Sequence, residues 1–253
     1  FILYSDNYFS YIRTHMKCNL KSFLLSAGTL LLTMCFNTTY AQKWDDKIII
    51  SQCTDQYVMS LDHENPIVKN TKRYVYESNS AITVNPETAA FYGENITLDD
   101  VSGRGMKLYK NITPENVFYD DTKACIIRGY IDKKGGTCKA SFERTFKDIK
   151  YFTRIYLLEE YFIRDKTLTI TIPKQLSGYH IKEMNFKGFN IETSHNSTPE
   201  GETFTYTLHN ADRMKEDKMM PPISNVYPYL LITGSFSDAN ALYTWSKEMA
   251  NVD

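Results

Sequence analysis

Cysteine is the residue in this chain best suited to nucleophilic catalysis, and Cys138 is the strongest candidate because it follows a glycine-rich turn at 132–136. A cysteine nucleophile needs a histidine to take its proton and a third group to orient that histidine. The histidines that could serve are His63, His180, His195 and His209. Cys138, however, opens a predicted strand, whereas reactive cysteines commonly lie at a helix N-terminus, where the thiol pKa is lowered. We therefore expect a structural thiol and predict no catalytic residue.

Three pairs of adjacent carboxylates could indicate glycoside hydrolysis, in which two acidic groups share the work and their spatial separation decides the mechanism. The pairs are Asp99-Asp100, Asp120-Asp121 and Glu159-Glu160. Neighbouring residues in a strand point to opposite faces, which argues against cooperation. Turn formation explains the aspartates and solvent exposure explains the glutamates. We expect no catalytic pair among them.

Metal and cofactor sites have no clear sequence signature. Zinc sites usually contain at least one closely spaced ligand pair, and the histidines are far apart in the sequence. The glycines at 103 and 105 are too few for a phosphate-binding loop. The sequence predicts no metal ligand and no cofactor-binding residue.

Composition narrows the possible partners. The chain has 253 residues, 19 of them tyrosines, and a net charge of −1. With this charge there is no global attraction to nucleic acid or to an anionic membrane. Tyrosine favours strands and half-buried surfaces. We therefore expect a folded β-rich protein that does not bind nucleic acid.

The segment 16–41 has the features of a secretory signal peptide. Lys17 and Lys21 precede an apolar run at 23–36, which is too short to span a bilayer comfortably, and Ala41 ends a small-residue cleavage site. We expect residues 1–15 to be over-extended translation and the mature chain to be periplasmic or secreted, without a stable membrane span. The alternatives are an uncleaved N-terminal anchor and, because Cys35 resembles a lipobox cysteine, a lipoprotein, which the bulky Met34 disfavours.

Three cysteines, Cys53, Cys125 and Cys138, remain after cleavage, and an odd number cannot all pair within one chain. In a hairpin centred on the turn at 132–136, Cys125 and Cys138 would be too far apart for a disulfide. We expect buried free thiols.

Alternation of apolar and polar residues dominates the mature chain and predicts strands. It is clearest at 167–172 and 203–208. Further predicted strands cover 47–53, 73–77, 81–84, 106–110, 117–119, 124–131, 138–146, 153–163, 181–193 and 227–234. Many short strands separated by turns indicate a mainly β fold, an antiparallel β-sandwich-like module of two packed layers, over 42–236.

A few segments depart from the alternating pattern. Residues 87–93, after Pro86, predict a short helix; 138–152 also has helical spacing, although we favour a strand there. The methionine-rich segment 214–220 predicts a loop that packs on the sheet.

A C-terminal helix is predicted over 237–253, with Ser237 as N-cap and Asp238 in the first turn. Leu242, Trp245 and Met249 share one face of this helix. The helix would pack back on the module or begin a further domain that is absent from this chain.

Several of these segments, taken in order, resemble a known bacterial family. They are Ile112-Thr113-Pro114-Glu115-Asn116-Val117, Ile126-Ile127-Arg128-Gly129-Tyr130, Leu168-Thr169-Ile170-Thr171-Ile172-Pro173, Phe204-Thr205-Tyr206, Pro221-Pro222-Ile223-Ser224, Tyr227-Pro228-Tyr229-Leu230 and Trp245. The order resembles the domain of unknown function, family 3857, that precedes transglutaminase-like domains in exported Bacteroidetes proteins. The resemblance implies a β-sandwich-like module followed, in full-length relatives, by a domain with a Cys–His–Asp triad. No triad residue can be carried over, because Cys138 lies inside the β module.

The function predicted from the sequence is that of an exported, non-catalytic β module, which binds or scaffolds beside a transglutaminase-like domain. Its partner would be a peptide, a glycan or a protein domain, contacted through edge strands and tyrosine-rich faces. The alternative is that the chain is part of a transglutaminase-like cysteine hydrolase or acyltransferase whose catalytic domain lies outside it. A third possibility is a subunit that docks a catalytic partner through Leu242, Trp245 and Met249.

Overall fold

The computed structural model describes residues 46–111, 122–215, 219–234, 236 and 238–250. The predicted over-extended segment 1–15, the signal peptide 16–41 and the predicted strand 117–119 lie outside these residues, as does the predicted N-cap Ser237. The predicted domain boundaries at 42 and 237 stay predictions.

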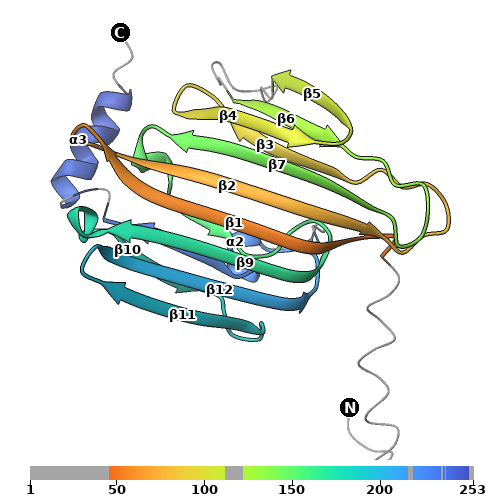
Figure 1. Cartoon of the computed structure of the whole chain (residues 1–253). Helices are drawn as coiled ribbons and strands as arrows, with labels where there is room; N and C mark the ends of the chain where they lie inside the picture. Colours follow the sequence, from red (N-terminus) through yellow and green to blue (C-terminus); the bar gives the residue numbers. More distant parts are fainter. Residues whose placement is uncertain (1–45, 112–121, 216–218, 235, 237, 251–253) are drawn as a thin grey trace, which may run out of the picture. The chain divides into compact units, whose positions relative to one another are not determined.

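The largest element is a twisted seven-stranded sheet in the order β11-β12-β9-β1-β2-β7-β4 (Figure 1). Its strands, in sheet order, are β11 (Ile191–Thr198), β12 (Gly201–Ala211), β9 (Phe162–Pro173), β1 (Ile48–Asp62), β2 (Asn65–Ser78), β7 (Thr137–Phe146) and β4 (Ile96–Gly103). All neighbouring pairs are antiparallel except β1 and β9, which run parallel. The mainly β, mostly antiparallel fold predicted from the sequence is confirmed.

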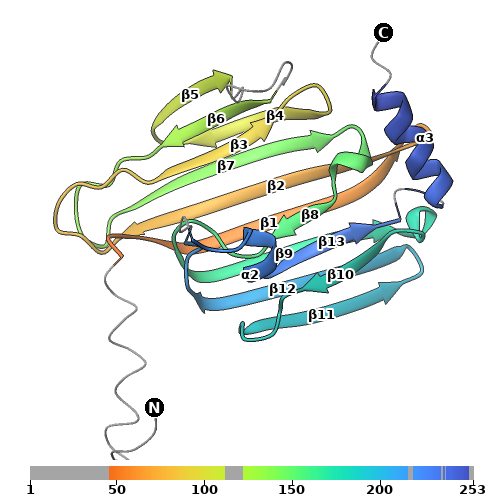
Figure 2. The same ribbon diagram turned by 180° about the vertical axis from the view of Figure 1, so that it is seen from behind.

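Two small sheets form the second layer. One contains β10 (His180–Met184), β13 (Tyr229–Thr233) and β8 (Arg154–Tyr156), and it lies in front of the large sheet in Figure 2. The other contains β3 (Glu87–Tyr92), β6 (Lys123–Arg128) and β5 (Met106–Asn111). The short helices are η1 (Ile149–Tyr151), η2 (Lys174–Leu176) and α2 (Ile223–Val226).

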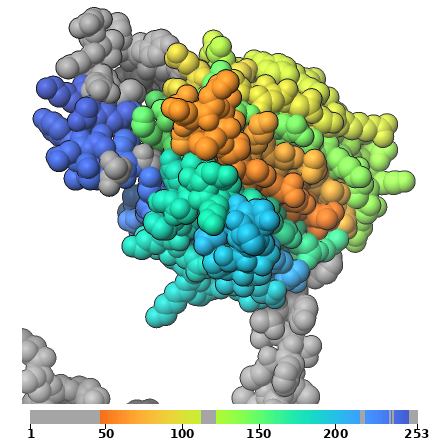
Figure 3. Space-filling view, turned by 60° about the vertical axis from the view of Figure 1, so that its left-hand side comes forward, coloured from red at the N-terminus to blue at the C-terminus, as the bar shows by residue number. Residues whose placement is uncertain are grey.

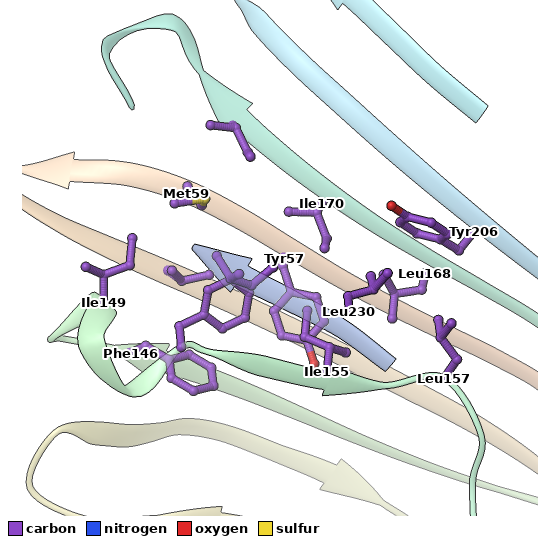
Figure 4. Packing of buried hydrophobic residues seen from close by; sticks show 14 of the residues in the cluster. Tyr57, Met59, Phe146, Ile149, Ile155, Leu157, Leu168, Ile170, Tyr206 and Leu230 are labelled. Carbon is purple, nitrogen blue, oxygen red and sulfur yellow. The ribbon is translucent and has the colours of Figure 1, made fainter. Parts of the chain in front are cut away.

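Each small sheet covers a separate hydrophobic core on the same face of the large sheet. The larger core, shown in Figure 4, packs Tyr57, Leu168 and Ile170 of the large sheet against Ile155 and Leu230 of the β10-β13-β8 sheet. The smaller core packs residues of β1, β2 and β7 against Ala90, Cys125 and Ile127 of the β3-β6-β5 sheet; from the large sheet it includes Cys53, Tyr74, Tyr76, Cys138, Ala140 and Phe142. The alternation of apolar and polar residues in the sequence explains why these side chains are buried, since every second residue of a strand faces the core.

Two predictions about single elements are wrong. Residues 87–92 form the strand β3 and not a helix, because pairing with β6 buries Ala90 against Cys125, whereas an isolated helix of this length has little stability in water. The hairpin imagined around the turn at 132–136 does not form. β6 and β7 belong to different sheets, and Ile131 instead bridges to Val84.

Two long predicted strands are divided between sheets. The segment 153–163 supplies β8 of a small sheet and then the first residues of β9 in the large sheet. The segment 181–193 supplies β10 and the first residues of β11, separated by a turn in which Asn185 has a φ of 58°. The strand prediction for 138–146 is confirmed by β7, and the helical spacing that followed corresponds to η1.

The predicted C-terminal helix is α3 (Ala239–Ala250), a blue surface region in Figure 3. Its N-cap is Asp238, one residue later than predicted, whose Oδ1 accepts a hydrogen bond from the backbone N–H of Ala241 at 2.8 Å. Trp245 packs on Phe236 with ring centroids 5.4 Å apart, whereas Leu242 is exposed. None of the described helices combines the length and hydrophobicity needed to cross a bilayer.

Candidate functional site

Charged and polar side chains lie between the two hydrophobic cores, at positions where the strand pattern places buried residues. Asp55 of β1 and Lys166 of β9 are each 1% exposed, and Asn70 of β2 is equally buried. Lys72 of β2 faces the same way, two residues from Asn70. We call the set Asp55, Asn70, Lys72, Arg144, Glu159 and Lys166 the polar band. Lone buried charges are very costly, so the partners of these groups determine whether the arrangement can exist.

Glu159 is the centre of the polar band, and it comes from the loop between β8 and β9. Its Oε1 lies 2.5 Å from Lys166 Nζ and 2.8 Å from Lys72 Nζ, while Tyr74 donates its hydroxyl to Oε2 at 3.1 Å. The loop is held in place because the backbone N–H of Met214 donates to the carbonyl of Glu159 at 2.8 Å. One carboxylate thus compensates two ammonium groups.

The electrostatics keep these groups ionised. Burial by itself would raise the pKa of the Glu159 carboxyl, but Lys166 and Lys72 outweigh burial and lower this pKa to about 2. Burial would likewise lower the pKa of Lys72, but Glu159, together with Tyr74, Asp55 and Cys53, outweighs burial, so this pKa is raised well above 10.5. A lysine that stays protonated is a poor nucleophile or base, so the arrangement does not favour covalent chemistry at Lys72.

Asp55 extends the band across the sheet. Asn70 Nδ2 donates to Asp55 Oδ1 at 2.8 Å, and Lys72 Nζ lies 3.6 Å from Asp55 Oδ2. Asn70 Oδ1 in turn accepts hydrogen bonds from Arg144 of β7 at 2.8 and 3.2 Å, and Arg144 reaches the carbonyl of Phe91 in β3 at 3.3 Å. Among the described residues, every buried side-chain nitrogen and oxygen has a hydrogen-bond partner. The band therefore links the large sheet to β3 without an unsatisfied group.

A pocket of about 290 Å³ opens beside the band, between β3 and the loop that carries Glu159. Its lining combines aromatic rings, among them Tyr76, Phe91 and Tyr161, with the carboxylates of Glu87, Glu159 and Glu160. Concave sites that mix apolar walls with a few polar groups are the usual form of ligand pockets.

The pocket also contains part of the unpaired edge of β3, which is the outer strand of its small sheet. The N–H of Glu87 donates to the Tyr161 hydroxyl at 3.1 Å, and the carbonyl of Phe91 accepts from Arg144, so both residues point away from β6. In an antiparallel pair, alternate residues direct both their N–H and C=O to the same side. Ala89, between them, must therefore also present its backbone to the pocket, and no described residue hydrogen-bonds to it there.

Cys138, the nucleophile candidate from the sequence, is buried in β7 within the smaller core. Burial raises its pKa, and among the described residues no histidine is hydrogen-bonded to it. Cys53, Cys125 and Cys138 are all buried free cysteines, as predicted.

The histidines are dispersed. His209 lies 2.7 Å from Asp165, His195 stacks on Phe204, His180 is in β10 and His63 is in the β1–β2 turn with a φ of 56°. The described residues contain no group of three or more His, Cys, Asp or Glu side chains that could hold a metal.

The adjacent carboxylates named in the sequence analysis do not form catalytic pairs in the described residues, and the two glutamates differ in exposure. Glu160 is exposed as predicted, but the prediction of solvent exposure for Glu159 is wrong, since only 13% of its side chain is accessible. Asp99 accepts hydrogen bonds from the hydroxyls of Thr97 and Thr145 on the surface. Asp120 and Asp121 lie outside the described residues.

Sequence reasoning missed the polar band, although part of its signal was present. Lys166 is in phase with Leu168 and Ile170, so its side chain had to face the core. Asp55 lies likewise between Cys53 and Tyr57. The contribution of Glu159 had no local signal, because it depends on how a loop folds over the sheet.

No family model matches this chain. No curated protein matches it either.

Several solved structures are similar to this chain. The chain is similar to a candidate protease from Parabacteroides distasonis, with a TM-score of 0.58 and 11% identity, over 81% of this chain and 44% of that protein. It is also similar to a candidate nutrient-binding protein from Legionella pneumophila, with a TM-score of 0.44, 9% identity and coverage of 82% and 76%. An M1 zinc metallopeptidase from Deinococcus radiodurans matches with a TM-score of 0.38, 7% identity and coverage of 74% and 42%.

At this identity the Parabacteroides similarity demonstrates a shared fold alone. This chain spans less than half of that protein's length. This mainly β chain therefore shares the fold of part of that longer protein.

Proposed function

We propose that this chain is an exported, non-catalytic module that holds an extended peptide segment in the pocket beside β3. The observation that carries the proposal is that Ala89, an exposed residue of the edge strand β3, lines an aromatic pocket at a position where alternation directs its backbone away from β6. A peptide strand that pairs with this edge would gain main-chain hydrogen bonds, and its alternate side chains would meet the pocket walls. The segment would belong to a partner or to a neighbouring domain of a longer protein.

The surroundings of β3 support this mode of binding. Arg144 and Tyr161 hold the two ends of the edge through Phe91 and Glu87, so the strand is fixed before a peptide arrives. A fixed edge reduces the entropy that binding must overcome. The tyrosine rings offer large amphipathic contact area, and Glu160 adds an exposed carboxylate that favours a basic side chain in the peptide.

The test compares Ala89→Pro with Ala89→Val. Proline removes the N–H that the peptide would need and is tolerated at a strand edge, whereas valine keeps the N–H. A panel of unstructured decapeptides of varied charge is measured by fluorescence anisotropy against the wild-type chain and both variants, and a glycan panel is measured in parallel. We expect basic peptides to bind the wild type and Ala89→Val, and to lose at least about tenfold in affinity on Ala89→Pro.

Equal peptide binding by the two variants would contradict the β3 edge as the site. If the chain bound glycans but no peptide, the proposal of a peptide ligand would be wrong, and the glycan partner predicted from the sequence would be favoured.

The second candidate function is part of a transglutaminase-like cysteine hydrolase or acyltransferase. It rests on the ordered segments that resemble family 3857 and on the similarity of this chain to part of a longer candidate protease. Genomic sequence beyond Asp253 tests it, since an in-frame domain with a Cys–His–Asp triad would favour this reading and a stop codon would favour a separate module.

A further inference from the structure

The outward face of the large sheet has a hollow of about 350 Å³. Its lining residues come from β1, β2, β7 and β4, which are neighbours in the sheet (Figure 1). Arg73 and Lys139 line it, and their sequence neighbours Tyr74 and Ala140 belong to the smaller core. Because side chains alternate along a strand, the hollow lies on the opposite face of the sheet from the polar band and the β3 pocket.

Strand register brings hydrogen-bond donors into one row across this hollow. Thr54 of β1 lies opposite Arg73 of β2, Arg73 lies opposite Ser141 of β7, and Ser141 lies opposite Ser102 of β4. Side chains directly opposite one another have Cβ atoms about 4.5–5.5 Å apart. Lys139 is two residues from Ser141 on the same face, and Gln52 is two residues from Thr54. Six donor side chains thus line the hollow, with Arg73 and Ser141 in the middle of the row.

Gly103 makes the row possible at the β4 end. A Cβ at this position would lie 2.9 Å from the carbonyl oxygen of Lys139 and 3.2 Å from Ala140 Cα. Only a residue without a side chain lets β4 approach β7 closely enough to bring Ser102 beside Ser141.

The two cations of the hollow lack acidic partners. Within the described part of the chain, neither Arg73 nor Lys139 forms an ion pair, whereas Arg164 pairs with Glu77 and Arg128 with Glu87. No carboxylate lines the hollow. The lining of the hollow therefore carries a net positive charge that a bound anion would neutralise.

We propose that this hollow binds a tetrahedral oxyanion, the sulfate or phosphate group of a small ester or the free ion. The planar guanidinium of Arg73 matches two oxygens of such a group, Lys139 adds a point charge, and the hydroxyls of the neighbouring Ser141 and Ser102 donate to the remaining lone pairs. A carboxylate has only about four acceptor sites, fewer than the donors that converge here. The volume leaves room for the organic part of an ester.

The test uses the purified chain and titrates sodium phosphate, sodium sulfate, glucose 6-phosphate and sodium acetate at constant ionic strength, followed by NMR chemical shifts. Arg73→Gln and Lys139→Gln each remove one cation of the hollow. Lys69→Gln is the matched control, because Lys69 is an exposed cation on the same face of β2 that does not line the hollow.

We expect phosphate and sulfate to shift backbone signals of Arg73, Lys139 and Ser141, and each hollow variant to lose about tenfold in affinity while Lys69→Gln binds like the wild type. Tighter binding of glucose 6-phosphate than of phosphate identifies an ester as the ligand, and equal binding identifies the free ion. Equal affinity for acetate, equal losses in all three variants, or no binding of phosphate or sulfate would overturn the proposal.

Discussion

Lys166 and Glu159 form a buried ion pair with Nζ and Oε1 2.5 Å apart, and the lysine side chain has no accessible surface. Lys166 belongs to β9 and Glu159 to the loop that leads into it, only seven residues earlier. The same carboxylate contacts Lys72 of β2 on the far side of β1. The pair therefore ties a loop to the middle of the sheet, at the point where the two cores are separated.

Removal of the Glu159 charge should strongly destabilise the fold. Glu159→Gln leaves Lys166 as a buried cation without its carboxylate, which costs about 3–5 kcal/mol in buried pairs. Urea unfolding followed by circular dichroism measures the loss. Glu160→Gln is the matched control, since this exposed neighbour should change the free energy of unfolding by less than about 0.5 kcal/mol. An equal effect of the two substitutions would contradict the role of Glu159.

The double substitution Glu159→Gln with Lys166→Met should recover part of that loss. The uncharged methionine replaces the buried ammonium group with an apolar chain of similar length, so the unpaired charge disappears. Additive effects of the two changes in a double-mutant cycle would show that the two groups do not interact.

Acid should destabilise the protein through Glu159. The pKa of this carboxyl is about 2 in the folded protein and 4.5 when unperturbed, so its contribution is fully present above about pH 4.5 and is lost as the pH falls towards 2. The loss is on the order of 3 kcal/mol. Thermal unfolding from pH 6 to pH 2 should show a shallower acid dependence in Glu159→Gln than in the wild type, and parallel curves would contradict this assignment.

The three buried cysteines, Cys53, Cys125 and Cys138, should not react with thiol reagents in the folded protein. Burial raises the pKa of all three thiols, that of Cys53 to about 12, so the thiolate fraction and the access of reagent are both small at neutral pH. Titration with Ellman's reagent at pH 8 should detect these three thiols only after denaturant is added. Rapid modification of any of them without denaturant would contradict the buried positions.

Gly129 should not tolerate alanine. A Cβ there would lie 2.6 Å from Cys138 Sγ and 3.1 Å from Pro86 Cγ, and overpacking of this kind costs about 1–3 kcal/mol. Gly178→Ala is the control, because a Cβ at Gly178 meets no atom within 4 Å. Combining Gly129→Ala with Cys138→Ala should relieve part of the cost, and a melting temperature as low as that of Gly129→Ala alone would point to the backbone or to Pro86 instead.

The sequence by itself determined which side chains face the core. Alternation identified most strands and predicted the mainly β layers, because the period of two is a local property of an extended chain. The same alternation, continued to Lys166, would have placed that side chain in the core, which we did not predict from the sequence. The C-terminal helix followed from local spacing in the same way. The prediction of a helix at 87–93 was wrong because pairing with β6, whose residues are 31 to 41 positions further along the chain, outweighs local preference.

Only the tertiary structure decided which strands share a sheet. The parallel pairing of β1 with β9, the separation of β6 from β7 and the division of 153–163 between two sheets depend on contacts between distant residues. The polar band and the hollow on the outward face depend on the same pairings, since strand register sets Lys72 opposite Asp55 and Arg73 opposite Ser141. Glu159 reaches Lys72 only because a loop folds over the sheet. The physical reason is that the apolar–polar pattern of a strand determines on which face of the sheet each side chain lies, but not which other strand it pairs with. The pairing depends on the free energy of the whole packed sheet.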